Sequence, residues 1–140
     1  MKIRWVEYRN TTYRFALFYP DTLSVKEYDE GTGARTISFE NADNSQGFEI
    51  FVLPYGGRQV SASRFKMDEP SGVMQQPTDV IVDGLSAQAG TRATMFFGHN
   101  TSMGDTREVW FIHGGYLFEV TTYKTFDVWL AGIMQSWQFL

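Results

Sequence analysis

The stretch from Arg107 to Tyr123 reads REVWFIHGGYLFEVTTY, and it predicts a β-hairpin that turns at a Gly-Gly pair. Runs rich in aromatic and β-branched residues flank Gly114-Gly115, and a two-residue hairpin turn needs residues that readily adopt positive φ. A turn of that length fixes the register, so that Trp110 faces Glu119 across the ladder. The two faces of the hairpin can therefore be assigned from the sequence.

The two predicted faces differ in character. One face carries Val109, Phe111, His113, Tyr116, Phe118 and Val120. The other face carries Glu108, Trp110, Ile112, Leu117, Glu119 and Thr121. We expect the more apolar first face to lie under a C-terminal helix. The second face is amphipathic and is expected to be partly covered core, and the alternative is an exposed binding patch of Trp110, Ile112 and Leu117.

The glutamates of the second face raise the question of catalysis. Glu108 and Glu119 are diagonal neighbours across the ladder, with Cα atoms about 7–8 Å apart. That spacing overlaps the separation of paired glycosidase carboxylates, and Trp110 could serve as a sugar platform. The simpler interpretation is a solvated pair of glutamates near Arg107, Lys124 or water. We expect the simpler interpretation to hold.

Composition bounds the remaining possibilities. A chain of 140 residues with 43% hydrophobic and 20% charged residues fits one globular domain. The net charge of -4, with scattered basic residues, argues against nucleic acid as a partner. The absence of cysteine excludes disulfides, thiol catalysis and Cys-type zinc sites. No apolar run approaches the roughly 20 residues that cross a bilayer.

Neither a metal site nor a cofactor is expected. The two histidines lie at opposite ends of the hairpin's first strand, because His99 precedes it and His113 ends it. The residues between them span roughly 20 Å at about 3.3 Å per residue, so they cannot share a metal within one subunit. No phosphate-binding, dinucleotide-binding or zinc-protease motif occurs in the sequence.

The rest of the chain predicts a mostly antiparallel α+β fold. Alternating or apolar runs bounded by turn residues predict strands at 13–20, 23–30, 34–41, 47–56, 77–84 and 85–98. The strand at 47–56 is apolar on both faces, which is typical of a central strand covered on both sides. A short edge strand is expected at the end, over 137–140.

Two helices are predicted. A short one begins after Ser61 as N-cap and ends before Pro70. A stronger one begins at Thr125, with Thr125 as cap and Asp127 in the first turn. Its apolar stripe consists of Phe126, Trp129, Leu130, Ile133, Met134 and Trp137. We expect this stripe to pack against the sheet.

Several segments together resemble one known family. The strand YRFALFYP from Tyr13, the step DVIVDGLSA from Asp79, the late hairpin and the closing SWQF from Ser136 resemble domains of the PsbP/Mog1/DcrB-like family. The resemblance implies an α/β/α sandwich around an antiparallel sheet. Members include photosystem II extrinsic subunits, a Ran-binding protein, bacterial lipoproteins and chaperones for secreted effectors, and they are generally non-enzymatic. None of their functional residues is matched here.

The functional expectation follows from this resemblance. We expect a lead-in over residues 1–12 and a single domain over 13–140 that works as a non-enzymatic binding or adaptor module for a protein or hydrophobic peptide. The alternatives are a carbohydrate hydrolase using Glu108 and Glu119, and a carrier of small apolar ligands with a pocket between sheet and helix. An exported or lipoprotein-type domain in the periplasm or at the cell surface is expected, with a leader preceding Met1, and the cytoplasm is the alternative.

Overall fold

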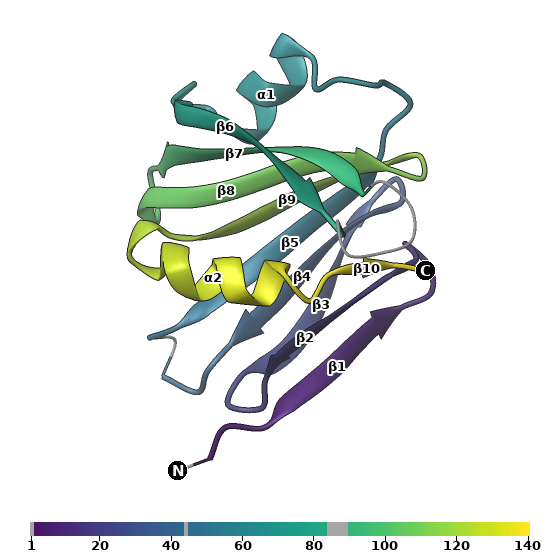
Figure 1. Cartoon of the computed structure of the whole chain (residues 1–140). Helices are drawn as coiled ribbons and strands as arrows, with labels where there is room; N and C mark the ends of the chain where they lie inside the picture. The colour runs from purple at the N-terminus through teal and green to yellow at the C-terminus, as the bar shows by residue number, and fades with distance from the viewer. Residues whose placement is uncertain (1, 44, 84–89) are drawn as a thin grey trace.

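A seven-stranded antiparallel sheet forms the centre of the computed structural model, which describes residues 2–43, 45–83 and 90–140 (Figure 1). Its strand order is β3-β4-β5-β9-β8-β7-β6, and a smaller sheet has the order β1-β2-β10. The strands are β1 (Trp5–Asn10), β2 (Phe15–Pro20), β3 (Ser24–Gly31), β4 (Ala34–Glu40), β5 (Gly47–Pro54), β6 (Gln75–Val82), β7 (Thr91–Asn100), β8 (Gly104–His113), β9 (Tyr116–Tyr123) and β10 (Gln138–Phe139).

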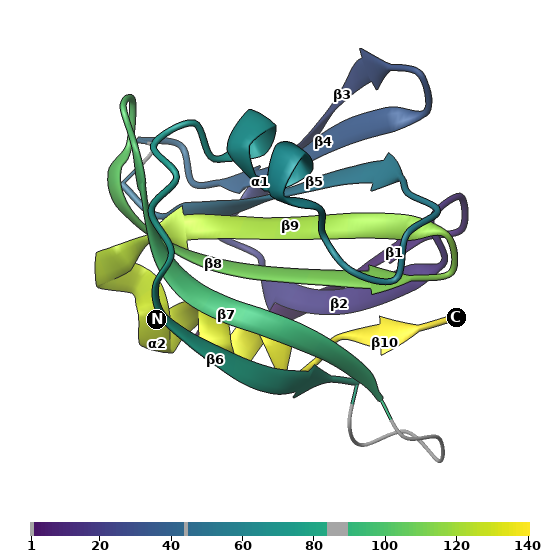
Figure 2. The ribbon, with the colours of Figure 1, turned by 90° about the horizontal axis from the view of Figure 1, so that it is seen from above.

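Two α-helices cover opposite faces of the large sheet, as Figure 2 shows. Helix α1 (Ala62–Asp68) lies on one face, and α2 (Asp127–Met134) lies on the other together with the small sheet. The predicted α+β class and the α/β/α layering are therefore confirmed. The strands at 34–40, 47–54 and 75–82 agree with their predicted ranges to within a few residues.

The central hairpin has the predicted register. Trp110 faces Glu119 and His113 faces Tyr116, so every residue of β8 and β9 lies on the face assigned to it. Gly114 and Gly115 have φ of 60° and 85°, which side chains other than glycine rarely adopt. The turn thus determines which residues point to α1 and which to α2.

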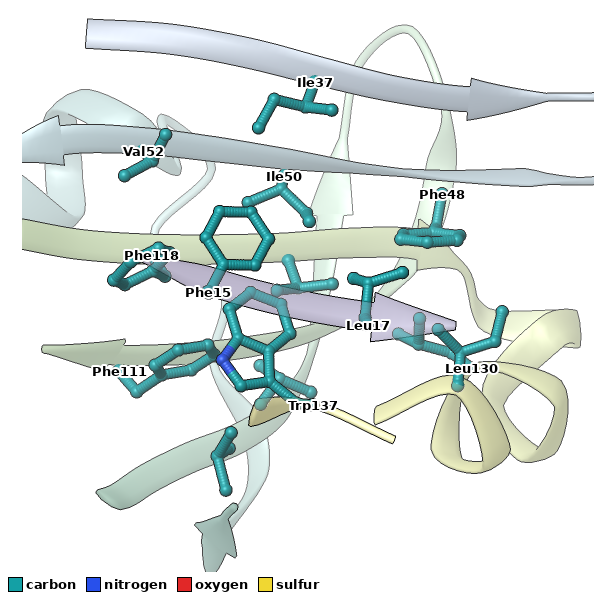
Figure 3. Packing of buried hydrophobic residues seen from close by; sticks show 14 of the residues in the cluster. Phe15, Leu17, Ile37, Phe48, Ile50, Val52, Phe111, Phe118, Leu130 and Trp137 are labelled. Carbon is teal, nitrogen blue, oxygen red and sulfur yellow. The ribbon is translucent and has the colours of Figure 1, made fainter. Parts of the chain in front are cut away.

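The main core lies on the α2 side of the sheet. Figure 3 shows Phe15 of β2, Phe118 of β9 and Phe111 of β8 around Trp137. The Trp137 ring stacks on Phe15 at a centroid distance of 4.5 Å and 7°, and it meets Phe111 and Phe118 edge-on at 5.0 and 5.6 Å. Offset stacking and edge-to-face packing are the favourable geometries for aromatic rings. The small sheet is thereby joined to the large one through aromatic contacts.

The C-terminal helix begins later than predicted. Residues Lys124–Phe126 form a 3-10 turn, and Thr125 makes no capping bond, so the predicted cap is wrong. Asp127 in the first turn accepts hydrogen bonds from the Arg107 guanidinium at 2.8 and 3.3 Å. That ion pair, with the Arg107 side chain only 7% exposed, fixes where the helix starts. Leu130 and Ile133 pack into the core as expected.

Other segments differ from expectation at their ends. The predicted lead-in contains β1, which pairs with β2 from Trp5 to Asn10. The predicted strand at 85–98 begins only at Thr91, and its residues up to 89 lie outside the described ones. The closing edge strand forms but is shorter, and it pairs with β2 in the small sheet.

Both edges of the large sheet are interrupted. At β6 the register shifts between Gln75 and Thr78, where Gln76 has a φ of 51° and Pro77 has no N–H to donate. At β3 the register shifts between Asp29 and Gly31. Bulges and proline are common devices that keep a free edge from pairing with another strand.

Trp137 allows a test of the aromatic core. Trp137→Ala is expected to lower the free energy of unfolding by about 3–5 kcal/mol, because a fully buried indole leaves a cavity. Trp137→Phe is expected to lower it much less, because the indole Nε1 meets no hydrogen-bond partner within the described ranges. Urea unfolding of both variants measures the difference. Equal losses would contradict this account of the core.

Candidate functional site

Helix α1 presents an unusual face to the sheet. Ser61 caps it by accepting a hydrogen bond from the Arg64 N–H at 3.1 Å, as predicted from the sequence. Phe65, Asp68 and Glu69 follow at i, i+3 and i+4, so they share one side of the helix. None of residues 62–68 is fully buried, whereas the C-cap Glu69 is 3% exposed. The helix therefore docks with one aromatic ring and two carboxyl groups.

The aromatic part of this contact covers the Trp110 face. The Phe65 ring lies 5.4 Å from that of Trp110 and 5.8 Å from that of Phe96 in β7. Trp110 is 4% exposed, Leu117 is fully buried and Ile112 is half-buried. The alternative of an exposed patch is therefore wrong for Trp110 and Leu117, and the expected partly covered core is what forms.

Glu108 lies beneath the C-terminal end of α1. It is 4% exposed and accepts hydrogen bonds from the Trp110 Nε1–H at 3.0 Å and the Thr106 hydroxyl at 2.8 Å. It also accepts a hydrogen bond from the Thr121 hydroxyl at 3.2 Å, and the Glu69 carboxyl is a further hydrogen-bond partner. Gly98 makes room for this group, because a Cβ there would lie 2.7 Å from Glu108 Oε2 and 3.2 Å from Glu69 Oε2.

Glu119 makes the second carboxyl pair. It is 5% exposed, and its Oε2 meets no N–H or hydroxyl donor in the described residues. Its partner is the Asp68 carboxyl. The Asp68 carboxyl also accepts a hydrogen bond from the Arg64 guanidinium at 3.2 Å. Two carboxyl groups can hydrogen-bond to each other only if one of them holds a proton. The contact between α1 and the sheet therefore contains two carboxyl pairs, and Arg64 lies beside one of them.

Burial controls the protonation of both sheet glutamates. Desolvation, followed by the hydrogen bond and charge of Glu69, raises the pKa of Glu108 to about 8. Desolvation, followed by the hydrogen bond and charge of Asp68, raises the pKa of Glu119 to about 11. The expected solvated pair is thus wrong. Arg107, which was expected nearby, points to the opposite face and binds Asp127.

The magnitude of this effect is large. A carboxyl that stays protonated in the folded state costs about 1.4 kcal/mol for each pH unit above its unfolded pKa. Both glutamates, whose ordinary pKa is 4.5, therefore make the docked contact of α1 less favourable as the pH rises above that value.

These glutamates do not have the setting that glycoside hydrolysis needs. A retaining or inverting enzyme holds its carboxyls on either side of a substrate cleft that water can reach. Glu108 and Glu119 are instead covered by α1 and hydrogen-bonded within the protein. The geometry thus fits an internal contact better than a catalytic pair.

A groove opens beside the N-terminal end of α1. Its volume is about 720 Å³, which falls in the range of ligand sites in proteins. Its lining includes the buried rings of Trp110 and Phe96, the half-buried Phe65 and Ile112, and the exposed Met74. The sequence had singled out Trp110 and Ile112, whereas the contribution of Phe65 and Phe96 depends on strand order, which the sequence does not reveal.

The rim of the groove is charged. Arg58 and Arg92 are exposed and line the groove together with Asp79. Within residues 2–43, 45–83 and 90–140, neither arginine takes part in an ion pair. The groove thus carries a local positive charge on a molecule whose net charge is -4.

A second cavity lies between the sheet and α2. It has a volume of about 260 Å³, and its lining includes Val82, Met95 and Leu130. Drug-sized ligands usually occupy about 300–1,000 Å³, so this space is small for a carrier. The larger opening is on the α1 face.

The histidines are separate, as predicted. His113 stacks on Phe139 at 3.7 Å and hydrogen-bonds to the Thr91 hydroxyl, while His99 hydrogen-bonds to Asp105. Burial lowers the pKa of His113. In the described part of the chain, no three His, Asp or Glu residues are placed to hold a metal ion.

Comparison with solved structures agrees with the overall fold. The chain superposes on the solution structure of cyanobacterial PsbP (CyanoP) from Synechocystis sp. PCC 6803 with a TM-score of 0.60 over 97% of this chain and 92% of that one. The fold is PsbP-like. Sequence identity is 10%, so the likeness concerns the fold alone. No protein-family model and no curated protein matches the sequence. Among the described helices, none is long and apolar enough to cross a membrane.

The carboxyl pairs predict how stability depends on pH. Both folded pKa values lie above the unfolded value, so the stability is greatest below about pH 4.5 and decreases as the pH rises toward 8. Glu119→Gln keeps the shape and donates to Asp68 without needing a proton. We expect this variant to have a flatter pH profile and a higher free energy of unfolding at pH 8, by about 1–3 kcal/mol.

Urea unfolding between pH 4.5 and 8 checks this prediction. Asp21→Asn, in the exposed turn before β3, is the matched control, and its profile should follow that of the wild type. A Glu119→Gln profile as steep as that of the wild type would contradict the proton-sharing pair.

Proposed function

We propose that this protein is a non-enzymatic binding module that holds an extended, apolar and acidic peptide segment of a partner protein in the groove beside α1. The observation that carries the proposal is the groove itself, whose lining combines aromatic side chains with two arginines that form no ion pair among the described residues. Peptide-binding sites often combine apolar pockets for side chains with a few charged groups that set orientation.

The apolar lining supports the choice of an apolar segment. Phe65 and Ile112 are half-buried, so part of each side chain is open to a ligand, and side chains already held by their neighbours lose little conformational entropy on binding. Exposed Met74 at the same groove adds an adaptable surface. Such a site fits alternate side chains of an extended peptide.

The rim supports an acidic partner. Arg58 and Arg92 outnumber the single carboxylate of Asp79 in the groove lining. Arginine binds carboxylates in a planar, two-pronged geometry. The positive rim would also repel basic segments, which gives the site selectivity.

The place of action that we propose is outside the cytoplasm. The resemblance to exported members of the PsbP-related group supports this, and determining the native gene's sequence upstream of Met1 tests it. A lipoprotein or secretory signal there is the expected result. An upstream sequence without such a signal would favour the cytoplasm instead.

Peptide binding tests the function directly. A fluorescein-labelled peptide in which leucine alternates with glutamate is titrated with the protein by fluorescence polarisation. We expect it to bind more tightly than a leucine–lysine peptide and a serine–glutamate peptide of the same length. Arg58→Glu and Arg92→Glu should each weaken binding about fivefold, as the loss of about 1 kcal/mol from an exposed ion pair predicts.

Arg4→Glu is the control, because Arg4 is exposed and does not line the groove. It should leave the affinity unchanged. Equal weakening by all three variants would show a general charge effect, and no binding of any peptide would overturn the proposal. Release of sugar from a glycoside panel by the wild type, but not by Glu119→Gln, would instead favour the hydrolase.

A further inference from the structure

We propose that α1 is a proton-controlled cover of the groove, which stays docked while its carboxyl pairs with the sheet hold their protons and lifts when they lose them. The inference rests on the proposed function in one respect, since it supplies the regulation of that same groove. The evidence is the geometry of the helix and of the four carboxyl groups between it and the sheet, Asp68 and Glu69 at the end of the helix and Glu108 and Glu119 in the sheet.

One face of α1 serves both sites. Phe65 on this face lines the groove, and Asp68 and Glu69, one turn further on, meet Glu119 and Glu108. A helix this short moves as a unit, since the Phe65 N–H bonds to the Ser61 carbonyl at its start and the Glu69 N–H bonds to the Phe65 carbonyl at its end. Any movement that separates the carboxyl pairs therefore also moves Phe65 away from Trp110.

The contact offers little else to hold the helix. Residues 62–68 include none that is fully buried, and Met67 is 66% exposed. Besides the ring of Phe65 and the carboxyl pairs, the contacts of the described residues include the Ser61 N–H, which donates to the Tyr55 hydroxyl at 2.9 Å, and the Ser71 hydroxyl, which donates to the His99 carbonyl at 2.8 Å. Most helices in proteins are held by an apolar stripe. Here carboxyl groups take the place of that stripe.

The surroundings provide few charges that could stabilise the ionised acids. Arg64 of α1 lies beside Asp68. From the sheet, β7 contributes Phe96 and Gly98, and β5 contributes Glu49, across Thr121 from Glu108. Burial and the charges of Glu40 and Glu30 raise the pKa of Glu49, so it is a further acid rather than a counter-ion. His99 faces Asp105 on the exposed side.

The consequence of proton loss follows from electrostatics. Two adjacent buried carboxylates repel each other, and neither is solvated. The global fold depends on the aromatic core on the other face, which contains none of these groups. Lifting α1 admits water to the carboxylates and leaves that core intact. Local opening of the helix is therefore the least costly response, and it widens the groove by moving Phe65 out of its lining.

Hydrogen exchange measures the cover without any ligand. The Glu69 N–H donates to the Phe65 carbonyl at 2.7 Å, so its protection reports the docked helix. Exchange rates are divided by the intrinsic rates at pH 6 and pH 9. We expect the protection of Glu69 to fall by about tenfold or more at pH 9, a decade in the opening equilibrium, while that of Val120 in β9 is unchanged.

Variants separate proton loss from a general effect of high pH. In Glu108→Gln/Glu119→Gln the amides donate to Glu69 and Asp68 at every pH, so the Glu69 N–H should stay protected at pH 9. The protection of Val120 shows whether the variant is folded. Glu69→Gln provides a second variant with the same expectation, because Glu108 and Glu69 form the pair that loses its proton between these two pH values. The proposal that α1 is a proton-controlled cover would be contradicted by either of two results at pH 9. One is that the Glu69 N–H loses protection in the wild type and the variants alike, and the other is that it loses none in the wild type.

The leucine–glutamate peptide links the cover to function. Wild type should bind it more tightly at pH 9 than at pH 6, and the double glutamine variant should bind it equally at both. If the Glu69 N–H loses protection at pH 9 but the peptide binds at neither pH, the proposed function is contradicted, while the proton-controlled movement of α1 is supported. If the peptide binds equally at both pH values and Glu69 stays protected, the cover fails and the proposed function stands.

Discussion

The Gly114-Gly115 turn is the constraint on which the rest of the structure depends. By allowing a two-residue connection, it sets the pairing of β8 with β9 and hence the direction of every side chain on the two central strands. A shift by one residue would send Phe111 and Phe118 to the α1 face and bring Glu108 and Glu119 into the aromatic core. The register thus separates an apolar layer from an acidic one across a single sheet.

The two layers have different physical roles. On the α2 side, Phe15, Trp137 and the central phenylalanines lie in close ring contact and hold two sheets and a helix together. On the α1 side, the contact is small and contains ionisable groups at its centre. Stability is therefore concentrated on one face, and the other face is free to respond to ligand or solvent conditions. Many binding proteins divide these roles in the same way.

The sequence predicted the elements that depend on local patterns. The hairpin register, the Ser61 cap and the α+β class follow from turn residues, capping and periodicity, whereas the α/β/α layering was implied by the family resemblance. It did not predict that Glu108 and Glu119 are buried, because the groups that bury them come from α1, and their meeting depends on how distant segments pack. Asp68 and Glu69 look like the polar end of an exposed helix in the sequence. The empty position at Gly98 has a role only once Glu108 is seen beside it.

The interrupted edge at β6 bears on how a partner could be chosen. A continuous free edge pairs with almost any extended chain, because backbone N–H and C=O groups are the same in every sequence. The shift between Gln75 and Thr78, with Pro77 inside it, removes that indiscriminate mode close to the groove. What remains is recognition through side chains, which differ from one protein to another. The kinked edge thus favours discrimination among partners, and it also hinders the chain from polymerising through its own strands.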